Sequence, residues 1–361
     1  MKNKKVIIRF LRYTLLVLLI SCSGNSDLHH EKWTEQEANN WYNEVGWKSG
    51  CNFNPSTAIN QLEMWQADTF DPVTIERELG WAKEIGFNSM RVYLHNLAWK
   101  SDPEGYKKRI NKYLEIADGK GITTIFVFFD DCWNDNPKVG KQPEPIPGVH
   151  NSGWIQGPGS VIANDSTQWN NLELYVKDIL NTFGSDKRIL LWDLYNEPGN
   201  TGQLNKSLPL LKSVLRWARE EGSSQPLSVA VWNYSEEYDS LNSFSLNNSD
   251  VITFHQYSSV DDVKPIVKDL RKYNRPLICT EYMARTNNSK FETHFPYFRS
   301  ENISCINWGL VSGKSQTIYP WGSQEGSPEP EIWFHDIFRS DGTPFNSSEI
   351  KLIKEITHKQ N

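Results

Sequence analysis

Short apolar runs alternate with stretches of helical period along most of this 361-residue chain. The runs are rich in β-branched, aliphatic and aromatic residues, as expected of buried strands. They lie at Lys48–Phe53, Ser89–Leu94, Thr123–Phe129, Ile189–Tyr195, Leu227–Trp232, Val251–Tyr257, Leu277–Tyr282 and Ser304–Gly309. Alternation of this kind predicts parallel strands joined by crossover helices.

The stretches between the runs carry helix signals. In the clearest, Asp71 is a suitable N-cap, Pro72 suits the first helical position, and Gly86 suits the C-terminal end. The other helical stretches are Tyr106–Gly119, Trp169–Phe183, Leu208–Glu221 and Val260–Tyr273. Eight strand–helix units predict an α/β fold, a (β/α)₈ TIM barrel. The competing doubly wound sheet would need a GxGxxG or GxSxG turn, and the sequence contains neither.

The N-terminal 21 residues have the pattern of an export signal. Basic residues precede an apolar run, Tyr13–Ile20, that is too short to span a bilayer. The run ends in Leu19-Ile20-Ser21-Cys22, which resembles the bacterial lipobox, so we expect residues 1–21 to be removed and Cys22 to be lipidated. The alternative is an ordinary signal peptide, or a short anchor, with an incidental cysteine.

The mature chain, residues 22–361, is expected to be one domain, with residues 22–40 as a tether, because no Pro/Ser-rich linker divides it. We expect it to be exported and held by its lipid at the outer membrane, cell surface or periplasm. This lipid would be its only membrane contact, and we expect a monomer.

Charge and metal-ligand patterns narrow the possible partners. The net charge is −6 and the basic residues are scattered, so no nucleic-acid footprint is visible. The eight histidines form no HExxH or Cys-flanked pair, so we expect no metal and no cofactor. Besides Cys22, the mature chain has Cys51, Cys132, Cys279 and Cys305. Three of these four lie within or at the ends of apolar runs, where a small buried thiol is typical, so we expect no obligatory disulfide framework.

Polar or aromatic side chains end most of the predicted strands, which is where barrel enzymes carry their active sites. The candidates in chain order are Arg91, Asp130, Asn196, Glu197, His255, Tyr257, Glu281 and Trp308. Each has an ordinary alternative when taken singly: a salt bridge for Arg91, a buried imidazole for His255, a turn residue for Asn196.

Glu197 and Glu281 fall at the ends of the fourth and seventh predicted strands. Two carboxylates that converge on one cleft, one protonated and one ionised, are what cleavage of a glycosidic bond requires. Arg91 could keep Glu281 ionised, and a hydrogen bond from Tyr257 could orient it.

Taken together and in this order, these residues resemble the pattern of glycoside hydrolase clan A and are most similar to that of the cellulase-like family 5. The resemblance covers the chain from about Gly50 to Trp308. The matching positions are Arg91, Asn196-Glu197-Pro198, His255-Gln256-Tyr257, Glu281 and Trp308. The resemblance implies a retaining β-glycosidase acting on a polysaccharide or its oligosaccharides. It implies that Glu197 is the acid/base and Glu281 the nucleophile, that Asn196 binds the sugar 2-hydroxyl, and that Trp308 forms the floor under the sugar.

The chain departs from the family at the end of the third strand. Family 5 members often carry a histidine there, whereas this chain has Asp130 and Asp131. The departure leaves the subfamily and the sugar open. We expect Asp130 to contact sugar hydroxyls or to cap the loop, in preference to binding calcium.

A long connection follows the third strand, from Asp130 to Gln168, with five prolines and no helical period. We expect an ordered wall of the cleft, with Trp133, Trp154 and Ile155 as apolar anchors, and with Trp133 or Trp154 stacked on a sugar. The alternative is that it packs over the outer helices.

A second irregular segment, Val311 to Pro330, could narrow the opposite side of the cleft. A cleft narrowed on both sides would favour short oligosaccharides or chain ends. Three other tryptophans also follow predicted strand ends and could line the cleft, namely Trp99, Trp232 and Trp321.

Two other functional classes are considered. A catalytically silent, surface-anchored carbohydrate-binding lipoprotein would be expected to lack one carboxylate, and both are present. An aldolase or metal-dependent hydrolase on the same barrel would call for a lysine or a His/Asp cluster at the strand ends, and the eight runs contain neither.

Overall fold

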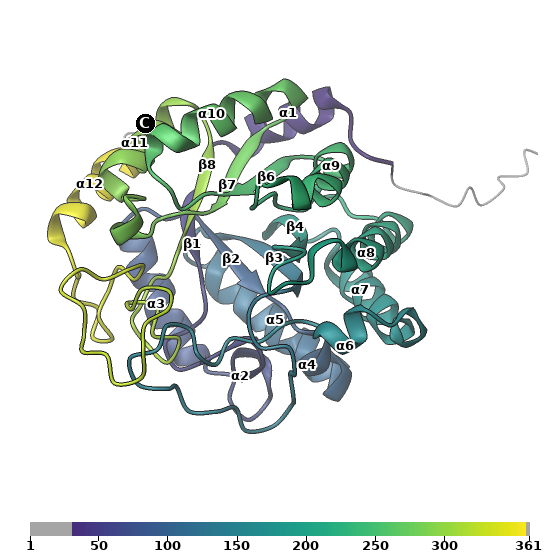
Figure 1. Cartoon of the computed structure of the whole chain (residues 1–361), viewed down its shortest axis with the longest axis horizontal. Helices are drawn as coiled ribbons and strands as arrows, with labels where there is room; N and C mark the ends of the chain where they lie inside the picture. The colour runs from purple at the N-terminus through teal and green to yellow at the C-terminus, as the bar shows by residue number, and fades with distance from the viewer. Residues whose placement is uncertain (1–30, 359–361) are drawn as a thin grey trace, which may run out of the picture.

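The computed structural model describes residues 31–358, so Cys22 and the proposed signal peptide lie outside the described residues. Eight parallel strands form one sheet in the order β5-β4-β3-β2-β1-β8-β7-β6 (Figure 1). The strands are β1 (Ser49–Asn52), β2 (Ser89–Tyr93), β3 (Thr123–Asp130), β4 (Ile189–Asn196), β5 (Leu227–Ser228), β6 (Ile252–His255), β7 (Leu277–Glu281) and β8 (Ser304–Trp308).

The two edge strands, β5 and β6, are linked just beyond the end of β5. Val231 forms a parallel bridge with Phe254, and the His255 N–H donates to the Val231 carbonyl at 2.9 Å. This contact brings the ends of the sheet together, and the predicted (β/α)₈ barrel is confirmed. β5 is shorter than predicted because only Leu227 and Ser228 pair with β4.

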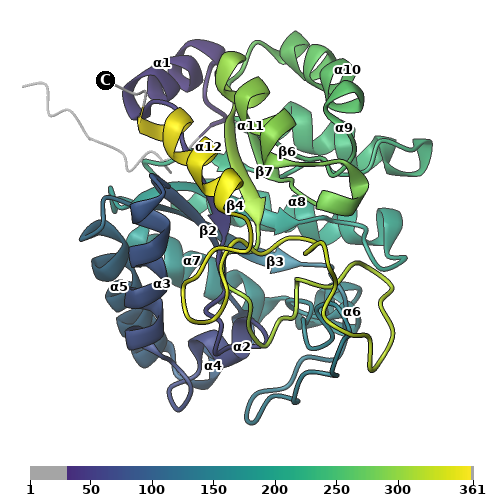
Figure 2. The same cartoon turned by 90° about the vertical axis from the view of Figure 1, so that its left-hand side faces the viewer.

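Helices surround the barrel in the order expected for alternating units (Figures 1 and 2). The longer ones are α3 (Pro72–Glu84), α5 (Pro103–Asp118), α7 (Asn170–Phe183), α8 (Leu208–Glu221), α9 (Asp239–Asn248), α10 (Val260–Leu270), α11 (Phe291–Ser300) and α12 (Ser347–Thr357). Shorter helices are α2 (Gln61–Trp65), α4 (Asn96–Ser101) and α6 (Ser160–Ala163). The predicted start of α3 is confirmed, since the Asp71 side chain accepts a hydrogen bond from the Thr74 N–H. Within residues 31–358, no helix combines the length and apolar character that crossing a membrane requires.

Helix α1 (Glu35–Val45) corrects the predicted extent of the tether. Its Ala38 and Tyr42 are buried in a cluster with residues from the N-terminal parts of several strands, Ile125, Leu190, Ile278 and Ile306 among them. The Tyr42 hydroxyl also donates to the Asn302 carbonyl at 2.9 Å. Residues 35–40 therefore belong to the folded body, where α1 covers the end of the barrel opposite the strand C-termini.

The two irregular segments follow β3 and β8 and lie side by side (Figures 1 and 2). The Gly148 N–H donates to the Gln316 side chain at 3.0 Å, and the Asn151 N–H donates to the Ser315 carbonyl at 2.8 Å. The predicted placement of Val311–Pro330 on the opposite side of the cleft is therefore wrong. The two segments form one continuous wall because their backbones hydrogen-bond to each other.

Gly50 in β1 leaves no room for a side chain. A Cβ atom there would lie 1.6 Å from the Ser89 carbonyl oxygen of β2, and only a backbone shift could relieve that overlap. We expect Gly50→Ala to destabilise the fold by more than the roughly 1–3 kcal/mol typical of overpacking. Gly80 in α3 has open space around it, so Gly80→Ala should instead stabilise by about 0.5–1 kcal/mol. Denaturant unfolding followed by circular dichroism measures both, and equal effects would contradict the expectation.

Candidate active site

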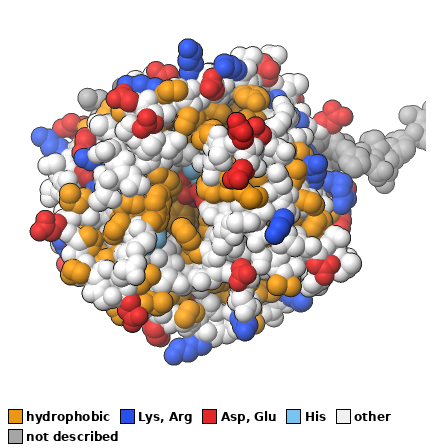
Figure 3. All heavy atoms as spheres, viewed as in Figure 1, with side chains coloured by type: hydrophobic (Ala, Val, Ile, Leu, Met, Phe, Trp, Pro, Cys, Tyr) orange, Lys and Arg blue, Asp and Glu red, His pale blue; other side chains and the backbone are white. Residues whose placement is uncertain are grey.

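A cavity of about 320 Å³ opens at the C-terminal ends of the strands. Figure 3 shows a hollow on this face, with hydrophobic side chains around acidic and histidine atoms. Seven of the predicted site residues line it, namely Trp133, Asn196, Glu197, His255, Tyr257, Glu281 and Trp308. Arg91 and Asp130 are buried and do not line it.

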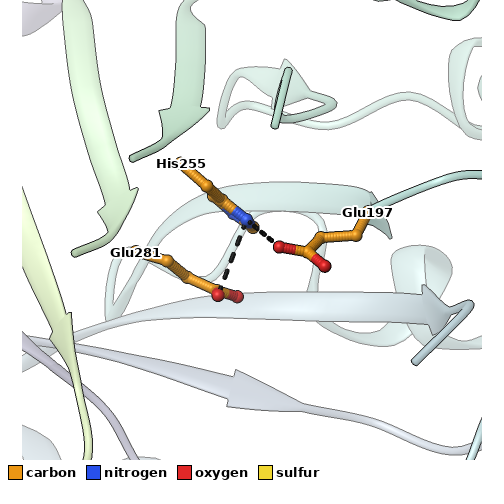
Figure 4. Close-up of side chains that lie close together, drawn as sticks. All are labelled: Glu197, His255 and Glu281. Atoms are coloured by element: carbon orange, nitrogen blue, oxygen red, sulfur yellow. Dashed lines mark hydrogen bonds and ion pairs between the residues drawn. The ribbon is translucent and has the colours of Figure 1, made fainter. Parts of the chain in front are cut away.

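Glu197, directly after β4, and Glu281, at the end of β7, face each other across the cavity floor with His255 between them (Figure 4). An oxygen of each carboxylate and one His255 nitrogen all lie within 4.8 Å of one another. His255 Nδ1 lies 2.8 Å from Glu197 Oε1 and 3.6 Å from Glu281 Oε2. Burial lowers the pKa of His255 to about 4, so the imidazole between the two carboxyl groups is neutral at pH 7.

Three donors surround the Glu281 carboxylate. Arg91 Nη1 donates to Oε1 at 2.7 Å, the Tyr93 hydroxyl donates to the same oxygen at 2.9 Å, and the Tyr257 hydroxyl donates to Oε2 at 2.8 Å. The predicted partners Arg91 and Tyr257 are thus both in contact with Glu281. These three donors fix the orientation of the Glu281 carboxyl group and place a cation beside it.

Glu197 lies in a different environment. Burial raises its pKa, while hydrogen bonds donated to Oε2 by the Cys132 thiol, at 3.3 Å, and by Asn200 Nδ2, at 2.5 Å, act in the opposite direction. Its backbone φ of +43° lies in the left-handed region, which is unfavourable for a residue with a side chain. The turn that begins with Glu197-Pro198 therefore directs this carboxyl group into the cavity at some conformational cost.

Asp130 supports the site from beneath and caps the loop, the second of its two expected roles, since its Oδ1 accepts a hydrogen bond from the Cys132 N–H at 2.8 Å. Its Oδ1 accepts from Asn196 Nδ2 at 2.9 Å and its Oδ2 accepts from Trp154 Nε1 at 2.7 Å. Burial raises the pKa of Asp130 to about 7. With its oxygens taken up by protein donors, Asp130 orients Asn196 and Trp154.

The sequence suggested anchoring for both Trp154 and Trp133 and sugar stacking for one of them, and although both line the cavity their exposure differs. Trp154 is only 2% exposed and packs edge-on against Tyr93 and Trp308, with ring centroids 5.0 and 5.6 Å apart, so it anchors the loop and supports Trp308. Trp133 is no anchor, because 43% of it is exposed at the cavity. Its φ of +105° is again unfavourable for a residue with a side chain.

Of the other tryptophans that follow predicted strand ends, Trp232 and Trp321 line the cavity. Trp99 lies elsewhere, on α4, where its indole donates to Asp178.

Sequence reasoning missed five residues that line the cavity, namely Cys132, His150, Asn151, Asn200 and His335. Asn200 stands three residues after Glu197, and a β4–α8 turn that brings its amide back to the carboxylate could have suggested it. Cys132 lies two residues after Asp130 and was not considered as a cavity residue; it is buried and free, as are Cys51, Cys279 and Cys305. His150, Asn151 and His335 lie in irregular segments, where no period indicates which way a side chain points.

Glu197, His255 and Glu281 also form a group that could offer three ligands to a metal ion. The surrounding hydrogen bonds argue for a different use. All four carboxylate oxygens already accept hydrogen bonds or contact His255, and the Arg91 cation lies 2.7 Å from Glu281. A divalent ion beside that guanidinium would be repelled, so the arrangement suits proton transfer and charge stabilisation.

A (β/α)₈ barrel with two facing carboxylates at its C-terminal end has the architecture of barrel glycosidases. The family profile described as Cellulase (glycosyl hydrolase family 5) matches residues 48–314. The protein is a glycoside hydrolase by class, and the chain belongs to glycosyl hydrolase family 5. No curated protein matches the sequence.

Solved structures with the same fold include several glycosidases. A GH5_18 protein from Streptomyces cattleya, in complex with Manb1-4GlcNAc, is 10% identical with a TM-score of 0.60, over 87% of this chain and 81% of that one. The endo-β-1,4-mannanase of Thermotoga petrophila is 14% identical with a TM-score of 0.56, over 88% and 77%. The endo-1,4-β-mannanase of Rhizomucor miehei is also 14% identical with a TM-score of 0.56, over 87% and 94%. At these identities the likeness concerns the fold.

Proposed function

We propose that this protein hydrolyses β-glycosidic bonds in a polysaccharide or its oligosaccharides with retention of configuration. Glu197 acts as the acid/base and Glu281 as the nucleophile. The observation that carries the proposal is the separation of the two carboxyl groups, whose nearer oxygens lie within 4.8 Å of each other. Retaining enzymes hold these groups about 5–5.5 Å apart, whereas inverting enzymes leave roughly 6.5–9.5 Å for a water molecule.

The two environments support this division of roles. Burial raises the pKa of Glu197 and so keeps it able to donate a proton to the leaving oxygen. Glu281 is surrounded by donors and can attack the anomeric carbon to form a covalent intermediate, which water then hydrolyses with Glu197 acting as the base. Asn196 and Trp308 line the same cavity, where they would contact the 2-hydroxyl and the face of the sugar.

Structures of similar fold include two endo-mannanases and a GH5_18 protein bound to Manb1-4GlcNAc. We therefore include β-mannosides with β-glucosides and β-xylosides among the first substrates to test. A catalytically silent binding protein remains the second candidate class. Both carboxylates are present, and they lie on opposite sides of one cavity with separate sets of hydrogen-bond partners. This arrangement favours the enzyme. A panel of aryl β-glycosides and plant polysaccharides, with sizing of the products, tests the activity.

Variants of the two glutamates separate the two roles. Glu281→Ala should lose at least about a thousandfold in activity, and azide should restore turnover by forming the glycosyl azide of inverted configuration. Glu197→Ala should lose about 10²- to 10⁴-fold on natural substrates but far less on glycosides with very acidic leaving groups, which need no protonation. Product configuration is read by NMR. Formation of the inverted glycosyl azide by Glu197→Ala rather than by Glu281→Ala would reverse the assignment, because azide acting in place of the acid/base gives the retained product.

The pH profile should report the hydrogen bond from Cys132 to Glu197. The acid must be protonated, so kcat/KM should fall as the pH rises through the raised pKa of Glu197. The Cys132 thiol stabilises the ionised form, and Cys132→Ala should therefore raise that pKa and move the alkaline limb upward by roughly 0.5–1 pH unit. Cys305→Ala, a buried thiol outside the cavity, is the matched control and should leave the limb in place. A downward movement, or none, would contradict the proposed contact.

We further propose that the chain is exported as a lipoprotein and held at a membrane by lipid on Cys22, a residue outside the described part of the chain. The support is the basic, apolar and Leu-Ile-Ser-Cys sequence pattern alone. Intact mass analysis of the membrane fraction should show a diacyl or triacyl adduct on an N-terminal Cys22. A water-soluble mature form cleaved at another position would refute this proposal.

A further inference from the structure

One wall of the cavity carries polar groups that the proposed chemistry does not use. His150 and Asn151, from the segment after β3, line the cavity together with His335, which follows Val311–Pro330 and whose N–H donates to the Thr317 carbonyl of that segment at 3.1 Å. None of them hydrogen-bonds to either catalytic carboxylate, whose partners are the groups described above. The hydrogen bonds that these three side chains already make show which of their atoms are free to bind a ligand.

Both imidazoles are fixed through Nδ1. His335 Nδ1 lies 2.6 Å from the Met283 carbonyl and His150 Nδ1 lies 2.7 Å from the Tyr319 carbonyl, and a carbonyl only accepts, so each Nδ1 carries the hydrogen. Burial lowers the pKa of His150 to about 4 and that of His335 well below its ordinary value. Both rings are therefore neutral at pH 7, and each Nε2 is an acceptor that has no partner within residues 31–358.

Asn151 adds an unpartnered amide to the same wall. The residue is 4% exposed, and within the described part of the chain neither end of its carboxamide makes a hydrogen bond. A buried polar group without a partner is unfavourable, so such a group facing a cavity indicates a ligand or ordered water there.

The wall stands on the Glu281 side of the cavity. The His335 ring centroid lies 5.6 Å from that of Tyr257, whose hydroxyl binds Glu281, and His150 lies 5.5 Å from His335. In the proposed mechanism, Glu197 serves the leaving oxygen and Glu281 attacks the anomeric carbon. The sugar that carries this carbon, on the non-reducing side of the bond, is therefore the one that meets the wall.

Hydrogen bonds join the two segments that carry this part of the cavity lining. The His150 N–H donates to Ser323 Oγ at 2.9 Å and the Asn151 N–H donates to the Ser315 carbonyl at 2.8 Å, which joins the two segments. At about 320 Å³, the cavity is near the lower end of the roughly 300–1,000 Å³ usual for ligand sites. A small cavity bordered by two joined segments favours a single sugar residue on the non-reducing side over a longer chain.

We infer that His150, Asn151 and His335 bind the hydroxyl groups of a terminal, neutral sugar, so that the enzyme removes sugars from non-reducing chain ends. This inference rests on the proposed retaining hydrolysis. Two acceptor nitrogens pair with hydroxyl donors, whereas an ionised carboxylate, sulfate or phosphate offers acceptors only. Among the described residues that line the cavity, none is lysine or arginine, so nothing there would balance an acidic sugar.

The test uses gluco- and manno-oligosaccharides, β-linked and labelled at the reducing end, together with aryl β-glucoside, β-mannoside and β-glucuronide. The first products should be an unlabelled monosaccharide and a labelled chain one residue shorter. O-Methylation of the terminal hydroxyls should slow cleavage at least about tenfold, and the glucuronide should not be cleaved. Early internal cleavage, or equal rates on the methylated substrate or the glucuronide, would overturn the inference.

Variants of the wall residues test whether these residues cause the preference for an unmodified terminal sugar. Asn151→Ala and His150→Phe should each raise KM for the aryl glycosides roughly 3- to 10-fold, as expected for the loss of an uncharged hydrogen bond. They should also reduce the discrimination against the methylated substrate, which a merely structural role would leave unchanged. Lys141→Ala, on the same segment with a side chain 87% exposed, is the control and should match the wild type.

The outcomes also separate this inference from the proposed function. Internal cleavage that depends on Glu281 would contradict the terminal-sugar site alone. Lack of hydrolysis across the whole substrate panel, or full activity in Glu281→Ala, would contradict the proposed function itself. Should both wall variants fail to fold, the methylated and glucuronide substrates still decide the inference with the unmodified enzyme.

Discussion

The arrangement of the site depends on one buried cation. The Arg91 guanidinium, on β2, is fully buried and lies 2.7 Å from both Asp193 of β4 and Glu281 of β7. It also donates to Asn196 Oδ1 at 2.7 Å. A guanidinium without these partners would be very unfavourable in the barrel interior. The need to balance its charge therefore holds the ends of three strands in one relative position, and with them the carboxyl group of Glu281 and the strand that leads into Glu197.

The active site also lowers the stability of the folded protein, and this cost helps to distinguish catalysis from simple binding. Glu197 combines a left-handed backbone with a buried carboxyl group, and the Trp133 backbone is unfavourable as well. Strained positions of this kind cost on the order of 1–3 kcal/mol each and persist where the surrounding structure imposes them. A protein that only binds sugar could place aromatic rings and amides around a cavity without a raised pKa or a strained glutamate. The energetics thus favour a catalytic use of the site over silent binding.

Features that depend on local pattern were predictable from the sequence, and features that depend on distant contacts were not. The strands and the positions of Glu197 and Glu281 follow from hydrophobic period and from polar residues at strand ends. Helix α1 was missed because its apolar residues are few and it is buried only through contact with the barrel end. Trp154 and Trp133 are alike as residue types, and only the bond from Trp154 to Asp130 and its packing on Trp308 decide which is exposed.

The polar groups in and beneath the cavity fall into two sets: hydrogen-bond donors around Glu281 and hydrogen-bond acceptors on the wall. Around Glu281 the donors Arg91, Tyr93 and Tyr257 are already occupied by the carboxylate, so they offer little to a sugar until charge leaves that group. On the wall, His150 and His335 offer free acceptors, because their N–H groups are bound to backbone carbonyls. A sugar hydroxyl that donates to the wall keeps its lone pairs for other donors. In the inferred binding mode, contact with the wall orients the sugar ring before the chemistry begins, and the backbone hydrogen bonds between the two segments keep the wall in one position.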